Sequence, residues 1–393
     1  MKIFVFEYVS AGGLGETPLL TEGYAMLKSI CSSLSAAGHE VHTLLCPEIS
    51  KLGIRPPADK IKTYSSLQDV KKILPYVDAC IPIAPDNLLY DLTKMIEAKT
   101  SVIGCPSKSI LSCSNKDETY GLASRISRYF EVPDYAALPI EVDPISEYCN
   151  EIGFPVVIKP VDGAGCEGIS VVNSNEGLAG AVKKVSDVSM AKKLIAQKFC
   201  EGEHMSCSLI CSKSGALPIS MNSQRINISG SNISYLGGIS PYPCAHKEEI
   251  FEESKAIAQK LGLFGFVGMD LLVSGDRTYF MEINPRVTTS FIALSNVIQM
   301  GELLVGCLED DLPSSVNLNG FGSVVIFPLK RSCAVGYEKI LQIPEVISPP
   351  FSEEGKVLAS VKSSSLYGIT DEINAVQKKL REIGVVCCVD HRP

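Results

Sequence analysis

Residues 265–290 read GFVGMDLLVSGDRTYFMEINPRVTTS, and this segment decides the fold that we expect for the chain. Two β-prone runs, residues 266–273 and 278–283, are separated by a polar turn at residues 274–277. Apolar runs of strand length on both sides of a short turn that contains glycine are typical of a β-hairpin. The segment therefore predicts two antiparallel strands joined by a tight turn.

Three polar side chains occupy this hairpin at positions where a buried strand would carry apolar ones. Asp270 lies in the first strand, and Glu282 and Asn284 lie two residues apart in the second. Strand side chains alternate between faces, so Glu282 and Asn284 share a face, and strand pairing can bring Asp270 beside them. Their oxygens suit Mg²⁺, which also binds substrate phosphates. Arg286 would add a planar cation for a phosphate or a carboxylate.

The same hairpin is open to a plainer interpretation, in which the carboxylates are ordinary groups on an exposed face. The run Phe-Met-Glu-Ile-Asn-Pro at residues 280–285 argues against it. A carboxylate between large apolar side chains is costly to bury unless it is paired or bound to a metal. We therefore expect a metal-binding face.

Composition and charge restrict the class of protein. The 393 residues are 46% hydrophobic and 20% charged, as in a globular chain of two or three domains. The net charge of −8 argues against nucleic acid as the main partner. No apolar run approaches a membrane span, and the N-terminus enters a strand without a signal-peptide pattern, so a cytoplasmic location is expected. The 15 cysteines lack CxxC spacing, which favours free buried thiols.

The N-terminal segment has the pattern of an open α/β domain. A strand, a Gly-rich loop, a helix and a strand follow one another as in a βαβ unit, at residues 2–8, 10–15, 22–37 and 40–46. The glycine spacing does not fit GxGxxG, which argues against a dinucleotide site. Ligands of such domains bind at the carboxyl ends of strands. Glu7, Gly12 and Gly13 lie at such an end and could hold a substrate, although a simple turn explains the loop equally well.

A second informative segment, residues 154–172, reads FPVVIKPVDGAGCEGISVV. It predicts a strand with Lys159, a loop with Gly163, Gly165 and Gly168, and a returning strand. Glycines let backbone N–H groups approach an anion closely, and a lysine supplies charge. The segment is no Walker A motif, and it predicts a hairpin flap over phosphates. A plain glycine-rich hairpin is the alternative, and Lys159 in an apolar strand argues against it.

The next strand, residues 193–199, leads into a polar link at residues 200–204. Such a link between two sheets can hold an adenine ring, whose edge would pair with backbone groups of Lys198 and Phe199 in an apolar slot. His204 could serve the same site, although a lone histidine is more often structural.

The remaining pattern gives further elements and two loops. Strands are expected at residues 77–83, 205–211 and 323–329, and helices at residues 88–97, 110–127, 176–188, 248–261, 291–305 and 370–383. Residues 229–240 are expected to form a Gly/Ser-rich loop, and residues 344–350 a proline-rich one. Residues 306–393 show no catalytic constellation and are interpreted as a lid, an extra layer or a dimer surface.

These segments together resemble the ATP-grasp carboxylate–amine ligases, which activate a carboxylate as an acyl phosphate and let an amine displace it. Lys116, Lys159 with the flap glycines, Gln197 to Phe199, and the run Asp270…Glu282-x-Asn284-x-Arg286 come in that family's order. The resemblance implies a mixed α/β ATP-grasp fold and ATP as co-substrate. The resemblance implies that Lys116 and Lys159 contact the ATP phosphates and that Gln197, Lys198 and Phe199 hold the adenine. It also implies that Asp270, Glu282 and Asn284 bind two Mg²⁺ (or Mn²⁺) ions and that Arg286 contacts the acyl phosphate.

One position departs from that family's pattern. The register that usually holds an acidic ribose ligand gives His204 here, with Glu203 one place earlier, so either side chain could reach the ribose.

Four shorter segments resemble a narrower group, the archaeal tyramine–glutamate ligases of methanofuran biosynthesis. They are EYVSAGG at residues 7–13, GEHMS at 202–206, SQRI at 223–226 and YLGGISPYP at 235–243. This resemblance implies the side-chain carboxyl of L-glutamate as the activated acid and tyramine as the amine. The residues expected to bind substrate are Glu7, Gly12, Gly13, Arg225 and Arg286.

The expected domain organisation has four parts. They are an N-terminal α/β substrate-binding domain at 1–106, a central flap-bearing subdomain at 107–190, an ATP-grasp subdomain with the magnesium site at 191–305, and an extension at 306–393. Small-molecule substrates are expected, with a homodimer as a further expectation. The alternatives are another amino-acid or dipeptide ligase of the same fold, a regulatory module that binds ATP without turnover, and an NAD-binding oxidoreductase.

Overall fold

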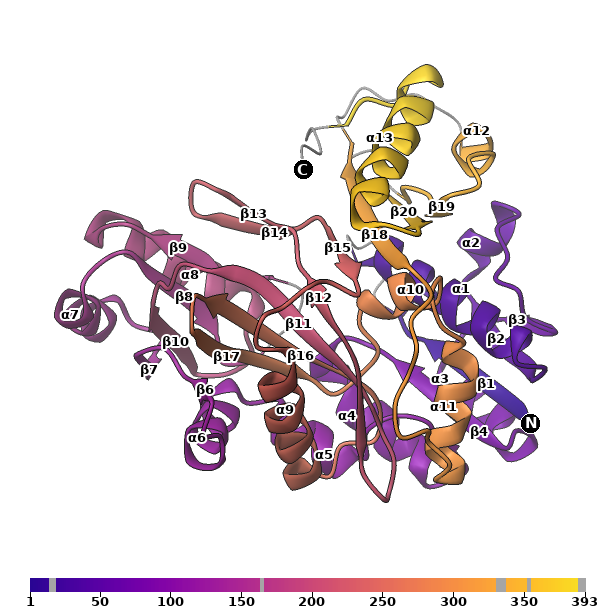
Figure 1. Cartoon of the computed structure of the whole chain (residues 1–393), viewed down its shortest axis with the longest axis horizontal. Helices are drawn as coiled ribbons and strands as arrows, with labels where there is room; N and C mark the ends of the chain where they lie inside the picture. Colours follow the sequence, from indigo (N-terminus) through magenta and orange to yellow (C-terminus); the bar gives the residue numbers. More distant parts are fainter. Residues whose placement is uncertain (14–18, 163–165, 330–336, 352–354, 388–393) are drawn as a thin grey trace.

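The computed structural model describes residues 1–13, 19–162, 166–329, 337–351 and 355–387. These residues form four β-sheets, which we call the N-terminal, flap, hairpin and C-terminal sheets. The N-terminal and flap sheets lie at opposite ends of the long axis, with the hairpin sheet between them (Figure 1). The predicted flap residues Gly163 and Gly165 lie outside the described ranges.

The N-terminal sheet is parallel and has the order β3-β2-β1-β4-β5. Its strands are β1 (Lys2–Glu7), β2 (Glu40–Leu45), β3 (Lys60–Thr63), β4 (Ala79–Ile83) and β5 (Ser101–Val102). Its helices are α1 (Leu20–Ala36), α2 (Pro47–Lys51), α3 (Leu67–Ile73) and α4 (Asp86–Glu97). Strands β1 and β4 are almost wholly buried, as helices on both faces of a parallel sheet require. The predicted open α/β pattern is confirmed.

The flap sheet is antiparallel and has the order β13-β14-β9-β8-β10-β7. It contains β7 (Tyr135–Pro139), β8 (Val156–Pro160), β9 (Ser170–Val172), β10 (Lys193–Lys198), β13 (Ile226–Ser229) and β14 (Asn232–Tyr235), with α7 (Val142–Ile152), the 3₁₀ turn η2 (Asn175–Gly177) and α8 (Leu178–Val188) packed on it. The predicted flap hairpin is confirmed as β8 and β9.

The expected loop at residues 229–240 is wrong. This segment carries β14 and β15 (Gly237–Ser240), and Gly230 forms the turn between β13 and β14 with φ of +60°. The many Ser, Asn and Gly residues concealed the strands because β13 and β14 form an outlying hairpin that is partly exposed.

The hairpin sheet has the order β12-β11-β16-β17-β6. Its members are β6 (Phe130–Glu131), β11 (Glu203–Cys211), β12 (Ala216–Ser223), β16 (Gly265–Ser274) and β17 (Arg277–Asn284), covered by α6 (Lys116–Ile126) and α9 (Lys247–Leu261). The predicted hairpin is confirmed as β16 and β17, with Asp270 opposite Glu282. A β-bulge follows Asp270 and shifts the register by one residue.

Two helices expected as single elements are divided. Residues 107–126 form α5 (Ser107–Cys113) and α6, because the side chain of Asn115 accepts a hydrogen bond from the Asp117 N–H at 3.0 Å and caps a new helix. Residues 290–309 form α10 (Ser290–Leu294) and α11 (Met300–Glu309). A Cβ on Gly301 would lie 2.1 Å from the Ser33 carbonyl oxygen of α1, so this glycine permits a close crossing of two helices.

The C-terminal sheet has the order β15-β18-β20-β19 and forms an extra layer over α1 and α10 (Figure 1). It contains β15, β18 (Phe321–Pro328), β19 (Val346–Ser348) and β20 (Lys356–Ser363), with the short helix α12 (Tyr337–Leu341) beside it and α13 (Leu366–Glu382) packed on one face. The expected proline-rich loop at 344–350 therefore includes a strand. Because β15 comes from the middle of the chain, this layer is tied into the centre of the molecule.

The described cysteines are free and mostly buried, as expected. No helix in the described ranges is long and apolar enough to cross a membrane. The domain boundaries stay predictions.

Candidate active site

A cavity of about 570 Å³, which we call the central cavity, lies between the flap and hairpin sheets. The residues predicted from the sequence that line it are Lys159, Gln197, Phe199, His204, Asp270, Glu282, Asn284 and Arg286. Helix α1 and the C-terminal sheet contribute Glu22 and Lys356 to the same wall. The structure therefore gathers groups from distant segments around one space.

The carboxylate of Asp270 lies at the centre of the predicted metal face. It accepts hydrogen bonds from Gln224 Nε2 at 2.8 Å and from Asn284 Nδ2 at 3.0 Å. Burial, and then the negative charge of Glu282, raise the pKa of Asp270 to about 6. Each of these neighbouring carboxylates disfavours the negative charge of the other, and a cation between them would stabilise both. The residues present therefore fit a divalent metal ion.

The donor set of this face is two carboxylates and one amide. Since Asn284 uses its amide nitrogen on Asp270, its amide oxygen can serve a metal. In the described ranges, no group of three or more His, Cys, Asp and Glu side chains could hold a metal ion. An oxygen-only set with few protein ligands is what Mg²⁺ accepts, because it keeps several waters and binds substrate phosphates.

Two lysines lie beside the metal face. Lys116 Nζ forms a mostly buried ion pair with Glu282 Oε1 at 2.8 Å. Lys159 Nζ donates to the Tyr120 hydroxyl at 2.5 Å, and this hydroxyl donates to Gln197 Oε1 at 2.9 Å. Burial, and then the charge of Lys116, lower the pKa of Lys159 to about 7. Because burial and the charge of Lys116 both disfavour the charged form of Lys159, a bound anion at this place would stabilise that form.

The Arg286 side chain is held by a residue of the N-terminal domain. Its Nε donates to Asp86 Oδ1 at 2.5 Å, and its Nη1 donates to the Val287 carbonyl at 3.3 Å. Asp86 is the first residue of α4 and follows the carboxyl end of β4. The guanidinium is thereby fixed on one edge, and the remaining N–H groups can face the cavity.

The link after β10 differs from the expectation in one respect. The backbone N–H of Lys198 donates to Asp134 O at 2.8 Å, and that of Phe199 donates to Pro155 O at 3.2 Å. The Lys198 ammonium points away from the cavity, where it donates to the Ile152 and Gly153 carbonyls, both at 2.8 Å. Any contact of this link with an adenine edge therefore falls to its carbonyl groups or to Cys200, which also lines the cavity.

Glu203 and His204 point to opposite sides of β11, because strand side chains alternate. His204 lines the central cavity, whereas Glu203 is exposed and lines a separate hollow beside His246. Burial lowers the pKa of His204, so its imidazole is neutral at pH 7.

Four expected substrate residues do not line the central cavity: Glu7, Gly12, Gly13 and Arg225. The buried Glu7 carboxylate accepts from the N–H groups of Val9 at 3.0 Å and Ser10 at 2.5 Å. Desolvation raises the pKa of this carboxyl group. Glu7 thus holds its own loop together. Gly168, with φ of +75°, lies at the base of the flap, and its neighbours Glu167 and Ile169 reach the cavity.

Three residues were not assigned from the sequence: Asp86, Tyr120 and Gln224. Each carried a usable signal. Asp86 follows the carboxyl end of a strand, Tyr120 lies one helical turn after Lys116, and Gln224 directly follows β12.

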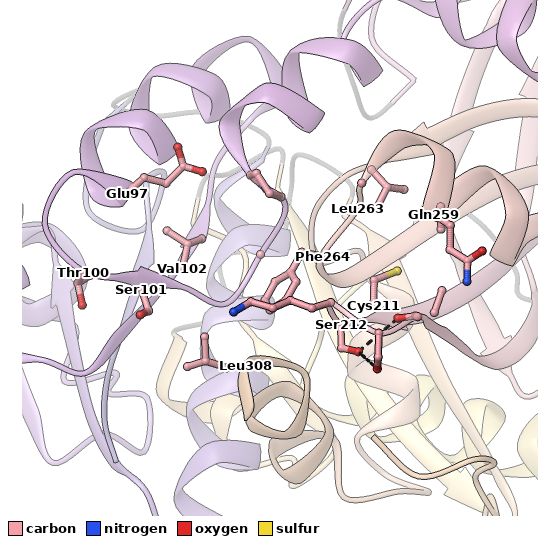
Figure 2. A pocket seen from close by; sticks show the side chains of 18 of the residues that line it. Glu97, Thr100, Ser101, Val102, Cys211, Ser212, Gln259, Leu263, Phe264 and Leu308 are labelled. Atoms are coloured by element: carbon pink, nitrogen blue, oxygen red, sulfur yellow. Dashed lines mark hydrogen bonds between the residues drawn. The ribbon is translucent and has the colours of Figure 1, made fainter. Parts of the chain in front are cut away.

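A second, open cavity of about 890 Å³ lies between the β5 region and the β11–β12 turn (Figure 2). Some of its polar side chains bond to one another or to nearby groups. Glu97 accepts from the Ser107 N–H at 2.8 Å and from the Ser107 hydroxyl at 2.6 Å, and the Ser212 and Ser214 hydroxyls are 3.2 Å apart. Since none of the predicted site residues within the described ranges lines it, the central cavity is the candidate active site.

Comparison with known proteins gives a consistent family. Residues 113–290 match the ATP-grasp domain model. The chain is 30% identical over 313 residues to the tyramine–L-glutamate ligase of Methanocaldococcus fervens, across 77% of this chain and 92% of the relative. It is 28% identical over 312 residues to the tyramine–L-glutamate ligase of Methanocaldococcus jannaschii, across 77% of this chain and 88% of the relative.

The fold is also found among solved structures. An ATP-grasp superfamily protein from Archaeoglobus fulgidus superposes with a TM-score of 0.64 at 26% identity, covering 92% of this chain and 99% of the other. The family resemblance drawn from the hairpin and flap is thereby confirmed. The chain therefore belongs to the ATP-grasp family and is an ATP-dependent carboxylate–amine ligase.

Proposed function

We propose that the enzyme joins the side-chain carboxyl group of L-glutamate to the amine of tyramine, forming γ-glutamyltyramine and releasing ADP and phosphate. The observation that carries the reaction type is the gathering of Asp270, Glu282, Asn284, Arg286 and Lys159 around one cavity. The choice of substrates is supported by the two tyramine–L-glutamate ligases that match most of the chain.

The reaction follows from the weakness of a carboxylate as an electrophile, since its leaving group would be an oxide. A side-chain carboxylate oxygen attacks the γ-phosphorus of ATP, and ADP leaves. The amine nitrogen then attacks the acyl carbon of the acyl phosphate. Phosphate leaves, and the amine loses a proton. Both steps concentrate negative charge, so the residues must supply positive charge in fixed positions.

The nucleotide is placed by groups at one end of the central cavity. The carbonyls of the β10 link and the Phe199 ring would contact adenine, and the neutral His204 would contact the ribose. Lys116 and Lys159 would meet the phosphates in place of their present partners, Glu282 and Tyr120.

The metal face would hold Mg²⁺, or Mn²⁺ in its place, on Asp270, Glu282 and the amide oxygen of Asn284. When bound, the ions would neutralise charge on the transferring phosphoryl group. Arg286, oriented by Asp86, would bind the acyl phosphate through a planar pair of N–H groups. Residues 166–169, with Glu167 on the cavity wall, would cover this intermediate and keep water from it.

The test is ADP release with MgATP and L-glutamate, with and without tyramine, and identification of the product by mass. The proposal expects release that depends on both substrates and a product whose mass is their sum less one water. Release with another acid–amine pair, and none with this pair, would keep the ligase and overturn the substrates.

A further inference from the structure

A second charged group lies on the wall of the central cavity, outside the ATP-grasp motif. Glu22 lies in the first turn of α1, and Lys356 is the first residue of β20. Lys356 Nζ lies 2.5 Å from Glu22 Oε1, and both residues line the cavity that holds Asp270 and Arg286. The side chains are 20% and 26% exposed for Glu22 and Lys356 respectively, so each keeps one side open to the cavity.

The surrounding contacts fix this pair in place. On the same helix, Thr21 Oγ1 donates to the Pro349 carbonyl at 3.4 Å, and Lys28 Nζ, further along, donates to the Ile347 carbonyl at 3.3 Å. The Tyr24 ring meets the Phe351 ring edge-on at 5.7 Å. Helix α1 is therefore seated on the C-terminal sheet along several residues, and the Glu22–Lys356 pair is not required to attach the two.

The pair and the metal face line the same cavity, so one small molecule bound there can contact both. The Tyr235 hydroxyl accepts a hydrogen bond from Thr289 Oγ1 at 2.9 Å and lies on the cavity wall. Burial raises the pKa of this phenol, and the charges of Glu22 and Asp270 raise it further. Tyr235, Glu22 and Asp270 all line this cavity.

We infer that Glu22 binds the α-ammonium group and Lys356 the α-carboxylate of the acid substrate, so that the C-terminal sheet completes the substrate site. This assignment rests on the proposed function, since it takes L-glutamate as the acid. Glutamate carries adjacent charges of both signs on its α-carbon, and its side-chain carboxylate is free to extend toward Arg286. Tyramine carries no anionic group, so Lys356 has no counterpart on it. An ion pair already formed can exchange each partner for one charge of the substrate.

The test compares L-glutamate with two analogues that each lack one charge. Glutarate has no α-ammonium group, and 4-aminobutyrate has no α-carboxylate. Wild type, Glu22→Gln, Lys356→Met and Lys356→Arg would be assayed for kcat and KM of each acid at saturating MgATP and tyramine. The matched control is Lys28→Met, which removes another contact between α1 and the C-terminal sheet outside the cavity.

Glu22→Gln is expected to raise the KM for glutamate about tenfold or more, as loss of a charge-assisted bond does, and to leave the KM for ATP unchanged. Its preference for glutamate over glutarate should shrink by a similar factor, while its preference over 4-aminobutyrate persists. Lys356→Met should show the reverse selectivity, and Lys356→Arg should retain much of the glutamate affinity. Lys28→Met should keep the glutamate KM, and melting temperatures report on the fold of every variant.

The outcomes separate the two claims. One outcome overturns the assignment alone: the wild type turns over glutamate, but Glu22→Gln and Lys356→Met either lose activity equally on all three acids or lose none. Wild type that forms no ADP with glutamate and any amine overturns the proposed function and this assignment together. If a variant is unfolded, the wild-type comparison of the three acids decides: equal KM values would overturn the assignment.

Discussion

The Lys116 ammonium lies 2.8 Å from the Glu282 carboxylate, so a side chain expected to bind phosphate is paired with one expected to bind metal. Both are largely shielded from solvent. A nucleotide that arrives with its metal would give each group a new partner, the phosphate for Lys116 and the cation for Glu282. Nucleotide binding would thus exchange this ion pair for two new contacts between opposite charges.

Glu282→Gln is expected to abolish ADP formation, because the metal face loses one of its two carboxylates. It should also lower the free energy of unfolding by about 2 kcal/mol, since the opposite charge beside a buried lysine is removed. Urea unfolding and ADP release check the two effects. The double variant Lys116→Met/Glu282→Gln should recover much of the stability and none of the activity. Turnover by Glu282→Gln at saturating Mg²⁺ would contradict the metal assignment.

The ATP affinity of the wild type is expected to fall as the pH rises above 7. Phosphates bind the charged form of Lys159, and the pKa of this lysine in the free protein is about 7 because of burial and the neighbouring Lys116. The fall should approach about tenfold per pH unit, the limit for one proton. Lys159→Met should bind ATP more weakly by about 2 kcal/mol and lack this slope. Parallel profiles for the two proteins, measured by titration calorimetry, would return Lys159 to a structural role.

Lys159 also makes the stability of the folded protein depend on pH, and stability is expected to rise with pH where ATP affinity falls. Its pKa is about 7 in the folded chain and 10.5 as the ordinary value, so the unfolded chain binds more protons between these limits. The free energy of unfolding of the ligand-free protein should therefore gain a contribution that rises from pH 7 toward pH 10.5. Denaturant unfolding of wild type and Lys159→Met across this window measures the contribution as a difference. An identical pH dependence in both proteins would show that Lys159 is charged when buried.

Asp86→Asn is expected to lower kcat tenfold or more with little change in the KM for ATP, because a misplaced guanidinium no longer meets the acyl phosphate. Arg286→Lys should lose at least as much, since the planar fork is absent. Glu97→Gln is the control, as this carboxylate lies on the same helix and accepts from Ser107 outside the central cavity. Steady-state kinetics that show equal rates for Asp86→Asn and Glu97→Gln would remove the positioning role.

His204→Ala is expected to raise the KM for ATP about threefold to tenfold, the usual effect of losing one neutral hydrogen bond. Glu203→Ala should leave it unchanged, because Glu203 is on the outer face of β11. Since burial lowers the pKa of His204, the imidazole contribution should be constant between pH 7 and 8. The opposite ranking of the two variants would assign the ribose to Glu203.

The hairpin and flap could be predicted from sequence because their information is local. Asp270, Glu282 and Asn284 interrupt apolar strands, and Lys159 does the same in β8. The partners of these residues could not be predicted in this way. Asp86 and Arg286 are 200 positions apart, and Tyr120 reaches Gln197 across 77. Such contacts depend on how sheets pack, which local patterns do not encode.

The errors have equally local causes. Strands β14 and β15 were expected as loop because polar residues and glycine are poor strand formers, yet pairing with β9 and β18 supplies their hydrogen bonds. The break before α6 comes from the cap at Asn115, which a continuous helical pattern concealed. The role of Lys356 was invisible because nothing in its own segment shows that β20 borders the cavity. The expected homodimer and cytoplasmic location stay predictions.

The central claim, activation of a side-chain carboxylate as an acyl phosphate, is tested most directly by oxygen transfer. L-Glutamate labelled with ¹⁸O in its side-chain carboxyl group would be turned over with MgATP and tyramine, and the released phosphate examined by mass. The account predicts one ¹⁸O atom in each phosphate, because that oxygen becomes the bridge of the acyl phosphate and leaves with phosphorus. Phosphate without label, from a reaction that forms the amide, would contradict it.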